Sequence, residues 1–298
     1  MVVAVLPSRC ILTHSHTQTH VISSIHTCTV TQWDITSSST TTLGHHTGAG
    51  TTVGEGSNND TANAQSTGPP KVGCSCVSFI DEHTVVSAGW DKTLHIWDCR
   101  TAEKPQVTIA LPGKAFGMDV RDHLAVVATS GRRNCVIDLT QGKLLLDRES
   151  SLKYQSRCVA VSPRDGFIAL GSIEGRVAVE SVDGLTTPSS KKKYAFKCHR
   201  MNDTVYPVNA IEFHPRFGTF CTGGCDGTVV VWDGNNKKKL TTLPRFETSV
   251  AALAFNHDGS ELAVAASYTF EEGDQPHPKD EIYIRPMLDS ECQPKGKQ

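Results

Sequence analysis

Residues 89–98, Gly-Trp-Asp-Lys-Thr-Leu-His-Ile-Trp-Asp, match residues 224–233, Gly-Cys-Asp-Gly-Thr-Val-Val-Val-Trp-Asp, almost position for position. Weaker copies of the same pattern lie elsewhere in the chain, and they end at residues 34, 138, 180 and 285. Successive ends are 40 to 53 residues apart, except for the interval of 64 residues between 34 and 98. The sequence is therefore an array of one repeated unit, and that unit decides the fold.

Each part of the unit has a physical role. Asp91 and Asp226 stand where a tight turn joins two strands, so that their carboxylates can accept backbone N–H groups. Gly227 supplies the positive φ that such a turn needs. Trp97 and Trp232 end a strand of alternating side chains, and we expect them to pack between neighbouring units.

A period of roughly 40 to 45 residues that ends in Trp-Asp is typical of WD repeats, in which four antiparallel strands form each blade of a β-propeller. We therefore predict an all-β propeller with five clear blades and one degenerate blade. A seven-bladed ring needs about 280 to 315 residues at this period. Nothing in the chain matches the first blade of such a ring, so we expect that blade to be missing. The alternatives are an incomplete or divergent N-terminus and a ring that closes with fewer blades.

Composition divides the chain into four segments. Residues 1–35 hold the degenerate partial blade, and residues 71–288 hold the propeller blades. Residues 36–70 are almost entirely Ser, Thr, Gly, Asn and Ala. Such residues bury too little apolar surface to offset the entropy of ordering, so we predict a disordered insertion there. Residues 289–298 are predicted to form a flexible tail.

The overall composition excludes several classes of protein. The 298 residues carry a formal net charge of -2, which argues against nucleic-acid binding through a bulk positive field. No apolar run is long enough to span a membrane, and the first residues do not form a secretory signal. The 11 cysteines are scattered, and the pairs Cys74/Cys76 and Cys221/Cys225 lack the spacing of a zinc site. We expect reduced cysteines, no metal, no cofactor and no catalytic residues, since no nucleophile elbow, phosphate-binding loop or zinc-hydrolase helix is present.

Several segments resemble a known family more closely than the repeat alone requires. The stretches ESSLKYQ (149–155), KKKYAFKCHR (191–200), YPVNAIEF (206–213) and HPKDEIYIR (277–285) look like the WD-repeat propeller of the spindle-assembly checkpoint. That propeller is the WD-repeat member of the budding-uninhibited-by-benzimidazole family. Its sister family, the WD-repeat messenger-RNA export factor, shares SIEGRVA (172–178) and FKCHR (196–200). The four longer stretches favour the checkpoint family.

The resemblance implies a non-catalytic adaptor. Checkpoint propellers of this kind bind GLEBS segments of checkpoint kinases and phosphorylated Met-Glu-Leu-Thr repeats on a kinetochore scaffold, and they join the assembly that inhibits the anaphase-promoting complex. The expected location is the nucleus, with kinetochores in mitosis and a cytoplasmic pool. No membrane partner and no nucleic acid are expected. Two alternatives stay open, namely an export factor that binds a nucleoporin GLEBS segment and an incomplete, non-functional propeller.

The resemblance also assigns candidate binding residues. Arg176 and Lys197 match the positions that bind phosphothreonine, and a guanidinium beside an ammonium suits a phosphate group. Trp90 matches a tryptophan exposed to the GLEBS peptide, and Arg157 matches a position that pairs with a glutamate of that peptide. Family members carry a second exposed tryptophan on their first blade. Nothing in residues 1–30 matches it, so half of that clasp is absent.

Overall fold

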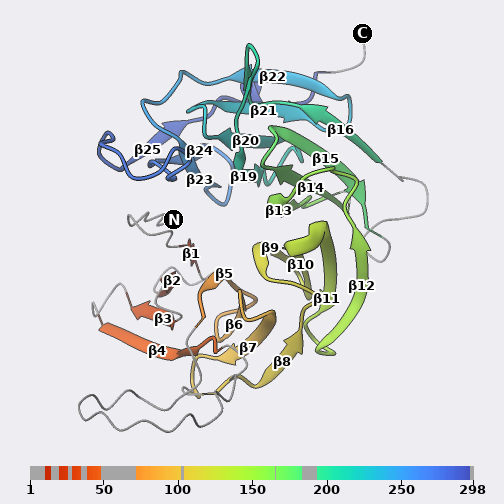
Figure 1. Ribbon diagram of the computed structural model, residues 1–298, viewed down its shortest axis with the longest axis vertical. Helices are drawn as coiled ribbons and strands as arrows, with labels where there is room; N and C mark the ends of the chain where they lie inside the picture. Colours follow the sequence, from red (N-terminus) through yellow and green to blue (C-terminus); the bar gives the residue numbers. More distant parts are fainter. Residues whose placement is uncertain are drawn as a thin grey trace, which may run out of the picture.

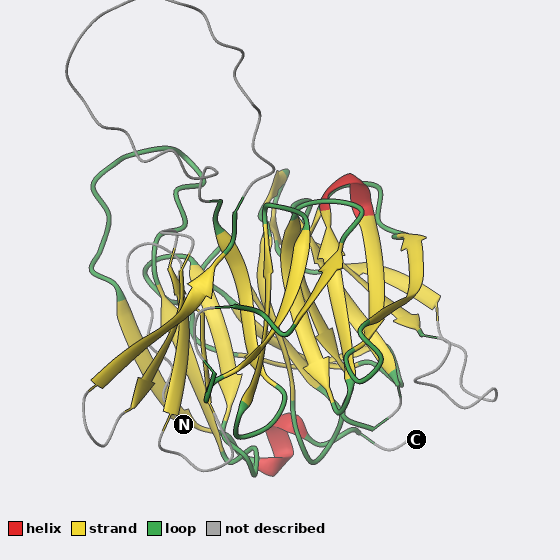
Figure 2. Ribbon diagram, turned by 90° about the horizontal axis from the view of Figure 1, so that it is seen from below, coloured by secondary structure: helices red, strands yellow, loops and turns green. Residues whose placement is uncertain are grey.

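The ring of antiparallel sheets predicted from the repeats is confirmed. The computed structural model describes residues 11–14, 20–25, 29–34, 39–47, 72–101, 104–164, 166–182 and 193–295. Figure 1 shows the chain passing once round the ring, from the N-terminal strands in red to the last sheet in blue. Two short helices, η1 (Ser130–Arg132) and α1 (Asp289–Cys292), lie at opposite faces of the ring (Figure 2). Within the described ranges, no helix has both the length and the apolar character of a membrane span.

Six sheets make up the ring, and in each of them neighbouring strands are antiparallel and adjacent in the chain. The first sheet comprises β1 (Ile11–His14), β2 (His20–Ile25), β3 (Thr29–Asp34) and β4 (Ser39–His45). The second comprises β5 (Cys74–Phe79), β6 (Thr84–Gly89), β7 (Thr93–Asp98) and β8 (Val107–Ala110). The third comprises β9 (Ala115–Arg121), β10 (Leu124–Thr129), β11 (Arg133–Asp138) and β12 (Lys143–Glu149).

The remaining sheets continue the same pattern. The fourth comprises β13 (Ser156–Val161), β14 (Phe167–Ser172), β15 (Arg176–Ser181) and β16 (Lys193–Lys197). A ribbon of β17 (Arg200–Met201) and β18 (Thr204–Val205) leads to the fifth sheet. The fifth comprises β19 (Val208–Phe213), β20 (Phe220–Gly224), β21 (Val229–Asp233) and β22 (Lys238–Thr242), and the last comprises β23 (Val250–Phe255), β24 (Glu261–Ala266) and β25 (Glu281–Pro286).

The repeat recognised in the sequence corresponds to one sheet. The endings at residues 34, 98, 138, 180, 233 and 285 all fall in the third strand of a sheet. The first strands of successive sheets contact one another from β5 through β9, β13 and β19 to β23, and β1 and β2 contact β5. In the described part of the chain, no comparably extensive contact joins β23–β25 to β1–β4.

The core lies between neighbouring sheets. Val30 and Leu43 of the first sheet pack with Cys74, Val85 and Trp97 of the second, and all five side chains are buried. Similar apolar clusters join the second sheet to the third, the third to the fourth, the fourth to the fifth and the fifth to the last. Trp97 therefore packs between units, as its place in the repeat predicts.

Two predicted segment boundaries are wrong. The insertion predicted for residues 36–70 overlaps β4, because Leu43 is buried against the second sheet and secures this Ser/Thr-rich strand. The rest of that segment, from Gly48 onward, lies outside the described residues. The tail predicted for 289–298 begins with α1, whose Cys292 is fully buried among residues of the last two sheets. The Thr219 hydroxyl donates to the Cys292 carbonyl over 2.8 Å, which fixes this end further.

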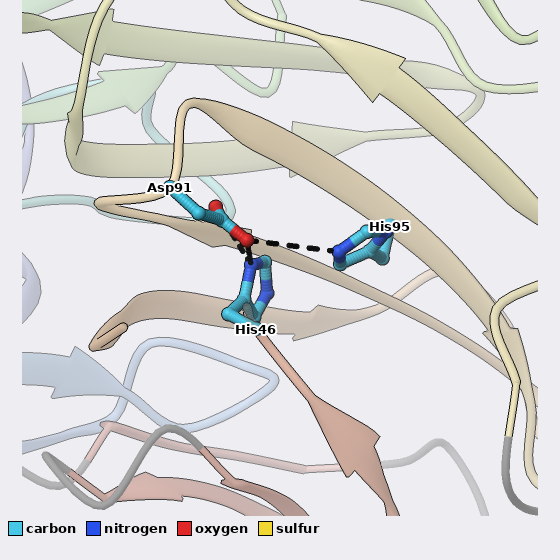
Figure 3. A group of neighbouring side chains, drawn as sticks. All are labelled: His46, Asp91 and His95. Atoms are coloured by element: carbon cyan, nitrogen blue, oxygen red, sulfur yellow. Dashed lines mark hydrogen bonds and ion pairs between the residues drawn. The ribbon is translucent and has the colours of Figure 1, made fainter. Parts of the chain in front are cut away.

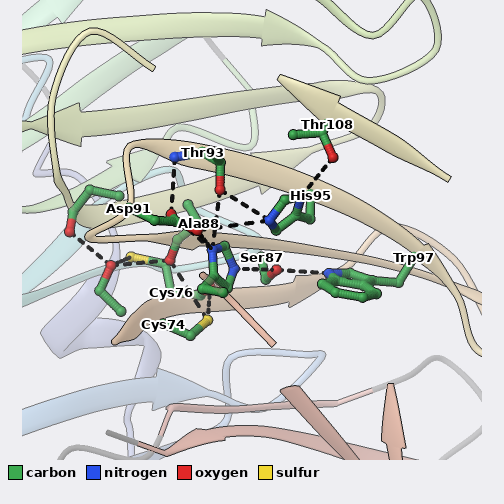
Figure 4. A network of polar contacts seen from close by, with 12 residues as sticks. Cys74, Cys76, Ser87, Ala88, Asp91, Thr93, His95, Trp97 and Thr108 are labelled. Atoms are coloured by element: carbon green, nitrogen blue, oxygen red, sulfur yellow. Dashed lines mark hydrogen bonds and ion pairs between the residues drawn. The ribbon is translucent and has the colours of Figure 1, made fainter. Parts of the chain in front are cut away.

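A chain of hydrogen bonds connects the first sheet to the second. His46, which follows β4, donates from Nδ1 to the Asp91 carboxylate over 2.9 Å (Figure 3). The Ser87 hydroxyl donates to His46 Nε2 over 2.8 Å, and the Trp97 indole donates to Ser87 Oγ over 2.8 Å (Figure 4). Asp91 also accepts the N–H of Thr93, which confirms its predicted role in the turn. Burial raises the pKa of Asp91, but the bonds from His46 and Thr93 outweigh it, so the pKa lies below its usual value.

The same arrangement recurs between the fourth and fifth sheets. His199 donates from Nδ1 to Asp226 over 2.9 Å, and the Thr222 hydroxyl donates to His199 Nε2 over 2.9 Å. The Trp232 indole donates to Thr222 Oγ1 over 3.0 Å, and the Thr228 N–H donates to Asp226. The two strongest copies of the repeat are therefore the two that carry this network.

Glycine is required beside each histidine. A Cβ on Gly89 would lie 2.5 Å from His46 Nδ1, and a Cβ on Gly224 would lie 2.4 Å from His199 Nδ1. No side chain fits at these distances, so the Gly-x-Asp of the repeat is a steric requirement of the network. Gly227 has φ of 72°, as its place in the turn predicts.

Removal of either aspartate is expected to destabilise the ring. Asp226→Ala leaves the buried His199 donor and the N–H of Thr228 without an acceptor, so we expect the free energy of unfolding to fall by about 2 to 4 kcal/mol. Asp91→Ala is expected to act similarly. Denaturant unfolding would measure both, and Asp274→Ala, at an exposed site, is the control. A loss below about 0.5 kcal/mol in both variants would contradict the structural role of the network.

His95 is expected to make the fold sensitive to acid. Burial and the neighbouring His46 lower the pKa of His95 to about 4, although Asp91 opposes this. As the pH falls below about 6.5, the unfolded chain binds a proton that the folded chain refuses, so stability is lost at up to about 1.4 kcal/mol per pH unit. Val230 stands at the matching position of the second network, so His95→Val is the natural test. Unfolding measured at several pH values between 7 and 5 should show a shallower loss in the variant, and equal slopes would contradict the prediction.

Candidate functional sites

The structure brings Arg176 and Lys197 together. Arg176 begins β15 and Lys197 ends β16, and the register of the two strands places them directly opposite each other. Lys197 is exposed and the Arg176 side chain is about a third exposed. Arg176 forms an ion pair with Glu174, with 3.8 Å between Arg176 Nε and Glu174 Oε1. Two positive charges therefore face each other at one end of this strand pair.

The other end of the same strand pair is arranged differently. Lys193 lies opposite Glu180, which is a complementary pair. Glu180 is buried, accepts from the N–H of Ser151 and pairs with Arg148 at 3.0 Å. Like charges placed opposite each other in a sheet are destabilising, whereas opposite charges are favourable. The Arg176–Lys197 pair is thus a local cost to the fold that an anion bound between the two side chains would relieve.

A pocket of about 360 Å³ opens beside Lys197, between the outer strand of the fourth sheet and the fifth sheet. Its aromatic wall is formed by Tyr194, Phe196 and Trp232, with the Phe196 and Trp232 ring centroids 4.7 Å apart. Lysines stand at its edge, and Lys237 Nζ lies 4.6 Å from the centroid of the Tyr194 ring. The remaining lining residues are Ala195, Phe220, Asp233, Gly234 and Lys238. The pocket can therefore take an apolar group that is attached to an acidic one.

Sequence reasoning missed this pocket. It predicted Trp232 as a packing residue, and the indole does pack against the fourth sheet, but it is only half-buried. Tyr194 and Phe196 alternate with exposed residues along β16, and that alternation in Lys-Tyr-Ala-Phe-Lys was the available signal. Neither strand forms the pocket alone, so the sequence could not pair Phe196 with Trp232.

Trp90 lies in the turn between β6 and β7. Its N–H donates to the carbonyl of Gly73 over 2.9 Å, and its ring packs over the same glycine. Lys114 Nζ lies 6.0 Å from the ring centroid. The residue is half-buried, and its indole nitrogen is on the buried side.

Arg157 lies near the start of β13, at a bulge between Ser156 and Cys158. It is half-buried, and its charge acts on the thiols of Cys158 and Cys225, each of whose pKa burial raises. Trp90 and Arg157 belong to the second and fourth sheets, with the third sheet between them. The structure therefore joins Arg176 to Lys197 but does not bring Trp90 and Arg157 into contact.

One group of side chains has the composition of a metal site. His46, Asp91 and His95 place three ligand atoms within 4.8 Å of one another (Figure 3). Each of these ligand atoms already takes part in a hydrogen bond, however. The Thr93 hydroxyl lies 3.3 Å from His46 Nδ1 and 3.0 Å from His95 Nε2. An ion would have to displace that hydroxyl and break the bond between His46 and Asp91. The donor set therefore fits the hydrogen-bonded network better than it fits a metal.

The chain is similar to proteins of known families. The model of the WD domain, G-beta repeat, matches residues 65–98 and 190–233. Mitotic checkpoint protein BUB3.1 of Arabidopsis thaliana is 48% identical over 222 residues, which cover 72% of this chain and 65% of that protein. Mitotic checkpoint protein bub-3 of Caenorhabditis elegans is 39% identical over 79% of this chain and 72% of that protein. The mRNA export factor GLE2 of Chaetomium thermophilum is 36% identical over 74% of this chain and 64% of that protein. The chain thus spans about two thirds of the length of these relatives.

Reversing one charge of the Arg176–Lys197 pair is expected to stabilise the protein. Lys197→Glu turns a like-charged cross-strand pair into a complementary one, so we expect the free energy of unfolding to rise by about 0.2 to 1 kcal/mol at low salt. Lys193→Glu, made on the same strand opposite Glu180, should lower it by a similar amount. Denaturant unfolding at low and high salt would measure both changes. A stabilisation that is absent at low salt would show that the two charges do not interact.

Proposed function

Because this chain belongs to the Bub3 family of WD-repeat mitotic checkpoint proteins, we propose that it is a non-catalytic adaptor that binds phosphorylated peptides on one side of its ring. The observation that carries the proposal is the pair of positive charges formed by Arg176 and Lys197. The ligand we propose is a Met-Glu-Leu-phosphothreonine repeat of a kinetochore scaffold. Such an adaptor would join kinases of the same checkpoint and the assembly that inhibits the anaphase-promoting complex. It would act in the nucleus and at kinetochores, with a cytoplasmic pool.

The chemistry of the pair suits a phosphate group. A phosphothreonine carries close to two negative charges and three acceptor oxygens at neutral pH. The guanidinium of Arg176 can hold two of those oxygens in parallel, while the ammonium of Lys197 adds a second charge from the opposite strand. Binding also removes the repulsion between the two side chains, so part of the binding energy comes from relief of a cost already present in the free protein.

The aromatic pocket supports the choice of peptide. The side chains of Lys197 and Arg176 lie on the opposite face of the sheet from Tyr194 and Phe196, so a peptide that continues from the phosphate over the edge strand β16 would reach Tyr194, Phe196 and Trp232. An apolar methionine or leucine side chain fits a wall of aromatic rings, and acidic groups fit the lysines at the edge. Phosphate and apolar side chains would be recognised together, which is what a Met-Glu-Leu-phosphothreonine sequence offers.

We also propose that Trp90 and Arg157 contact a GLEBS segment on the face of the ring that carries the β6–β7 turn. An outward-facing indole is a suitable anchor for a peptide, and Arg157 has no hydrogen bond or ion pair within the described ranges, so its guanidinium is available to a carboxylate. The two residues lie one sheet apart, so a single contact cannot serve both. A peptide that uses both must therefore cross the third sheet.

Phosphate-dependent binding is the direct test. Fluorescence anisotropy should show that a Met-Glu-Leu-phosphothreonine peptide binds at least tenfold more tightly than its unphosphorylated form. Loss of one charged hydrogen bond costs about 1.5 to 3 kcal/mol, so Arg176→Ala or Lys197→Ala should weaken binding by roughly tenfold to a hundredfold. Lys193→Ala, at the other end of β16, is the matched control and should bind normally. Equal affinity for both peptides would rule out the proposed site.

The GLEBS contact is tested separately. Trp90→Ala and Arg157→Ala should each weaken binding of a GLEBS peptide at least severalfold. Neither should affect binding of the phosphopeptide. Trp90 lies on a different sheet from Arg176 and Lys197, and Arg157 lies at the opposite edge of their sheet from the pocket. Ile173→Ala, an exposed apolar residue in the corresponding turn of the fourth sheet, is the control. If GLEBS binding is unchanged in both variants, Trp90 and Arg157 are structural residues only.

Two other functions make different predictions. A messenger-RNA export factor would bind a nucleoporin GLEBS segment regardless of phosphate, and a gel shift with single-stranded RNA would detect any RNA binding. The similarity to the export factor GLE2 favours this as the second candidate. An incomplete, non-functional propeller would bind neither peptide and would unfold without a cooperative transition.

A further inference from the structure

One carboxylate lies beside the two cations of the candidate phosphate site. Glu174 belongs to the turn between β14 and β15, and its Oε1 lies 3.8 Å from Arg176 Nε. The Glu174 side chain is 18% exposed and the Arg176 side chain is 34% exposed, so solvent reaches both. Among the described residues, Arg176 is the ion-pair partner of this carboxylate, which accepts no hydrogen bond. Because 3.8 Å is too long for a hydrogen bond, the two groups are held together by charge alone.

The backbone of this turn is fixed on both sides of Glu174. The Glu174 N–H donates to Ser172 Oγ over 3.3 Å, and the Glu174 carbonyl accepts from Arg200 Nη2 over 3.1 Å. The carbonyl of the next residue, Gly175, accepts from the Cys198 N–H over 3.0 Å. Gly175 has φ of 63°, a conformation that suits glycine best. The turn therefore holds the base of the Glu174 side chain beside the candidate phosphate site.

Glu174 changes the charge that an anion meets at this site. Arg176 and Lys197 stand opposite each other and repel, and the Glu174 carboxylate offsets part of that repulsion in the free protein. With Glu174 in place, the three side chains carry one net positive charge, whereas the two cations alone would carry two. An anion that binds between the cations is therefore attracted less strongly than the Arg176–Lys197 pair by itself would allow.

The carboxylate has two opposite effects on a bound phosphate. By holding the Arg176 guanidinium it reduces the entropy that the side chain loses on binding, and by repelling the phosphate it lowers the affinity. An ion pair without a hydrogen bond does little to orient a guanidinium, because orientation comes from paired N–H···O bonds. Repulsion acts whatever the orientation, and it grows with the charge of the ligand. Repulsion is therefore the larger effect.

We propose that Glu174 is an internal anion that competes with phosphothreonine for Arg176 and limits the affinity of the phosphate site. The inference rests on the proposed function. In the free protein the carboxylate pairs with Arg176, and in the complex the phosphate replaces it. A single acidic side chain gains little from one net positive charge, whereas phosphothreonine carries close to two negative charges and gains about twice as much. Glu174 thereby keeps acidic but unphosphorylated segments out of the site.

Glu174→Gln tests the proposal, because it removes the charge and keeps the shape of the side chain. If the lost repulsion strengthens binding of one carboxylate by roughly threefold, a dianion at the same place gains the square of that factor, roughly tenfold. Fluorescence anisotropy at low salt should show these gains for a Met-Glu-Leu-glutamate peptide and a Met-Glu-Leu-phosphothreonine peptide, respectively. Both gains should shrink at about 1 M salt, where the Debye length is about 3 Å.

The same substitution should destabilise the free protein. Without the carboxylate, the repulsion between Arg176 and Lys197 is no longer offset, so the melting temperature should fall by about 1 to 3 °C at low salt. A residue with only a structural role would lower stability and affinity together, whereas an internal anion changes them in opposite directions. Glu261→Gln is the control, since it changes the net charge equally at an exposed position on the last sheet, and it should alter neither quantity.

The outcomes separate this inference from the proposed function. If the wild type prefers the phosphopeptide, then weaker or unchanged binding by Glu174→Gln, or a gain that is as large at high salt as at low salt, would overturn the internal anion alone. If neither protein distinguishes the phosphopeptide from its unphosphorylated form, both proposals fail. If only Glu174→Gln distinguishes them, the carboxylate closes the site in the wild type, so the internal anion stands and the proposed function fails.

Discussion

A buried hydrogen bond between a histidine that follows one sheet and an aspartate in a turn of the next is the interaction on which the rest of the structure depends. It occurs twice, as His46 with Asp91 and as His199 with Asp226. Each histidine is fully buried, so an unpaired ring nitrogen would be costly and the bond fixes how one sheet stands against the next. The bond thereby adds a buried directional contact to the apolar packing between the two sheets.

The candidate binding residues are attached to these two networks. Trp90 is the residue before Asp91, and Lys197 lies two residues before His199. Trp232 donates to the second network and forms a wall of the pocket. The positions of all three side chains therefore follow from the buried network. A scaffold that is rigid beneath an exposed side chain reduces the entropy lost when a peptide binds.

The charged pairs at the two ends of the β15–β16 strand pair have opposite effects on stability. Glu180 with Lys193 supports the strand pair, whereas Arg176 with Lys197 opposes it. Binding sites commonly retain such a local cost, because the ligand relieves it. There the fold is less stable than it could be, and the unmet interaction favours a ligand of opposite charge.

The sequence by itself determined the repeated unit. Turn residues, strand alternation and the terminal Trp-Asp are local features with local physical causes, so the third strand of every sheet could be located in advance. It also predicted Arg176 and Lys197 as a phosphate site, though only through resemblance to a family. Local composition was misleading where order depends on neighbours. Ser39–His45 has the composition of a flexible segment, and it is a strand because Leu43 is buried beside Trp97 of the next sheet.

Only the tertiary structure decided which residues meet across sheets. The pocket joins Phe196 of one sheet to Trp232 of the next. The two histidine–aspartate bonds join residues 27 and 45 positions apart, and α1 is ordered because Cys292 is buried against the last two sheets. These contacts depend on how one sheet packs on another, which local periodicity does not encode. The sequence therefore determined the units and their order, and packing between the units decided which side chains meet in the candidate sites.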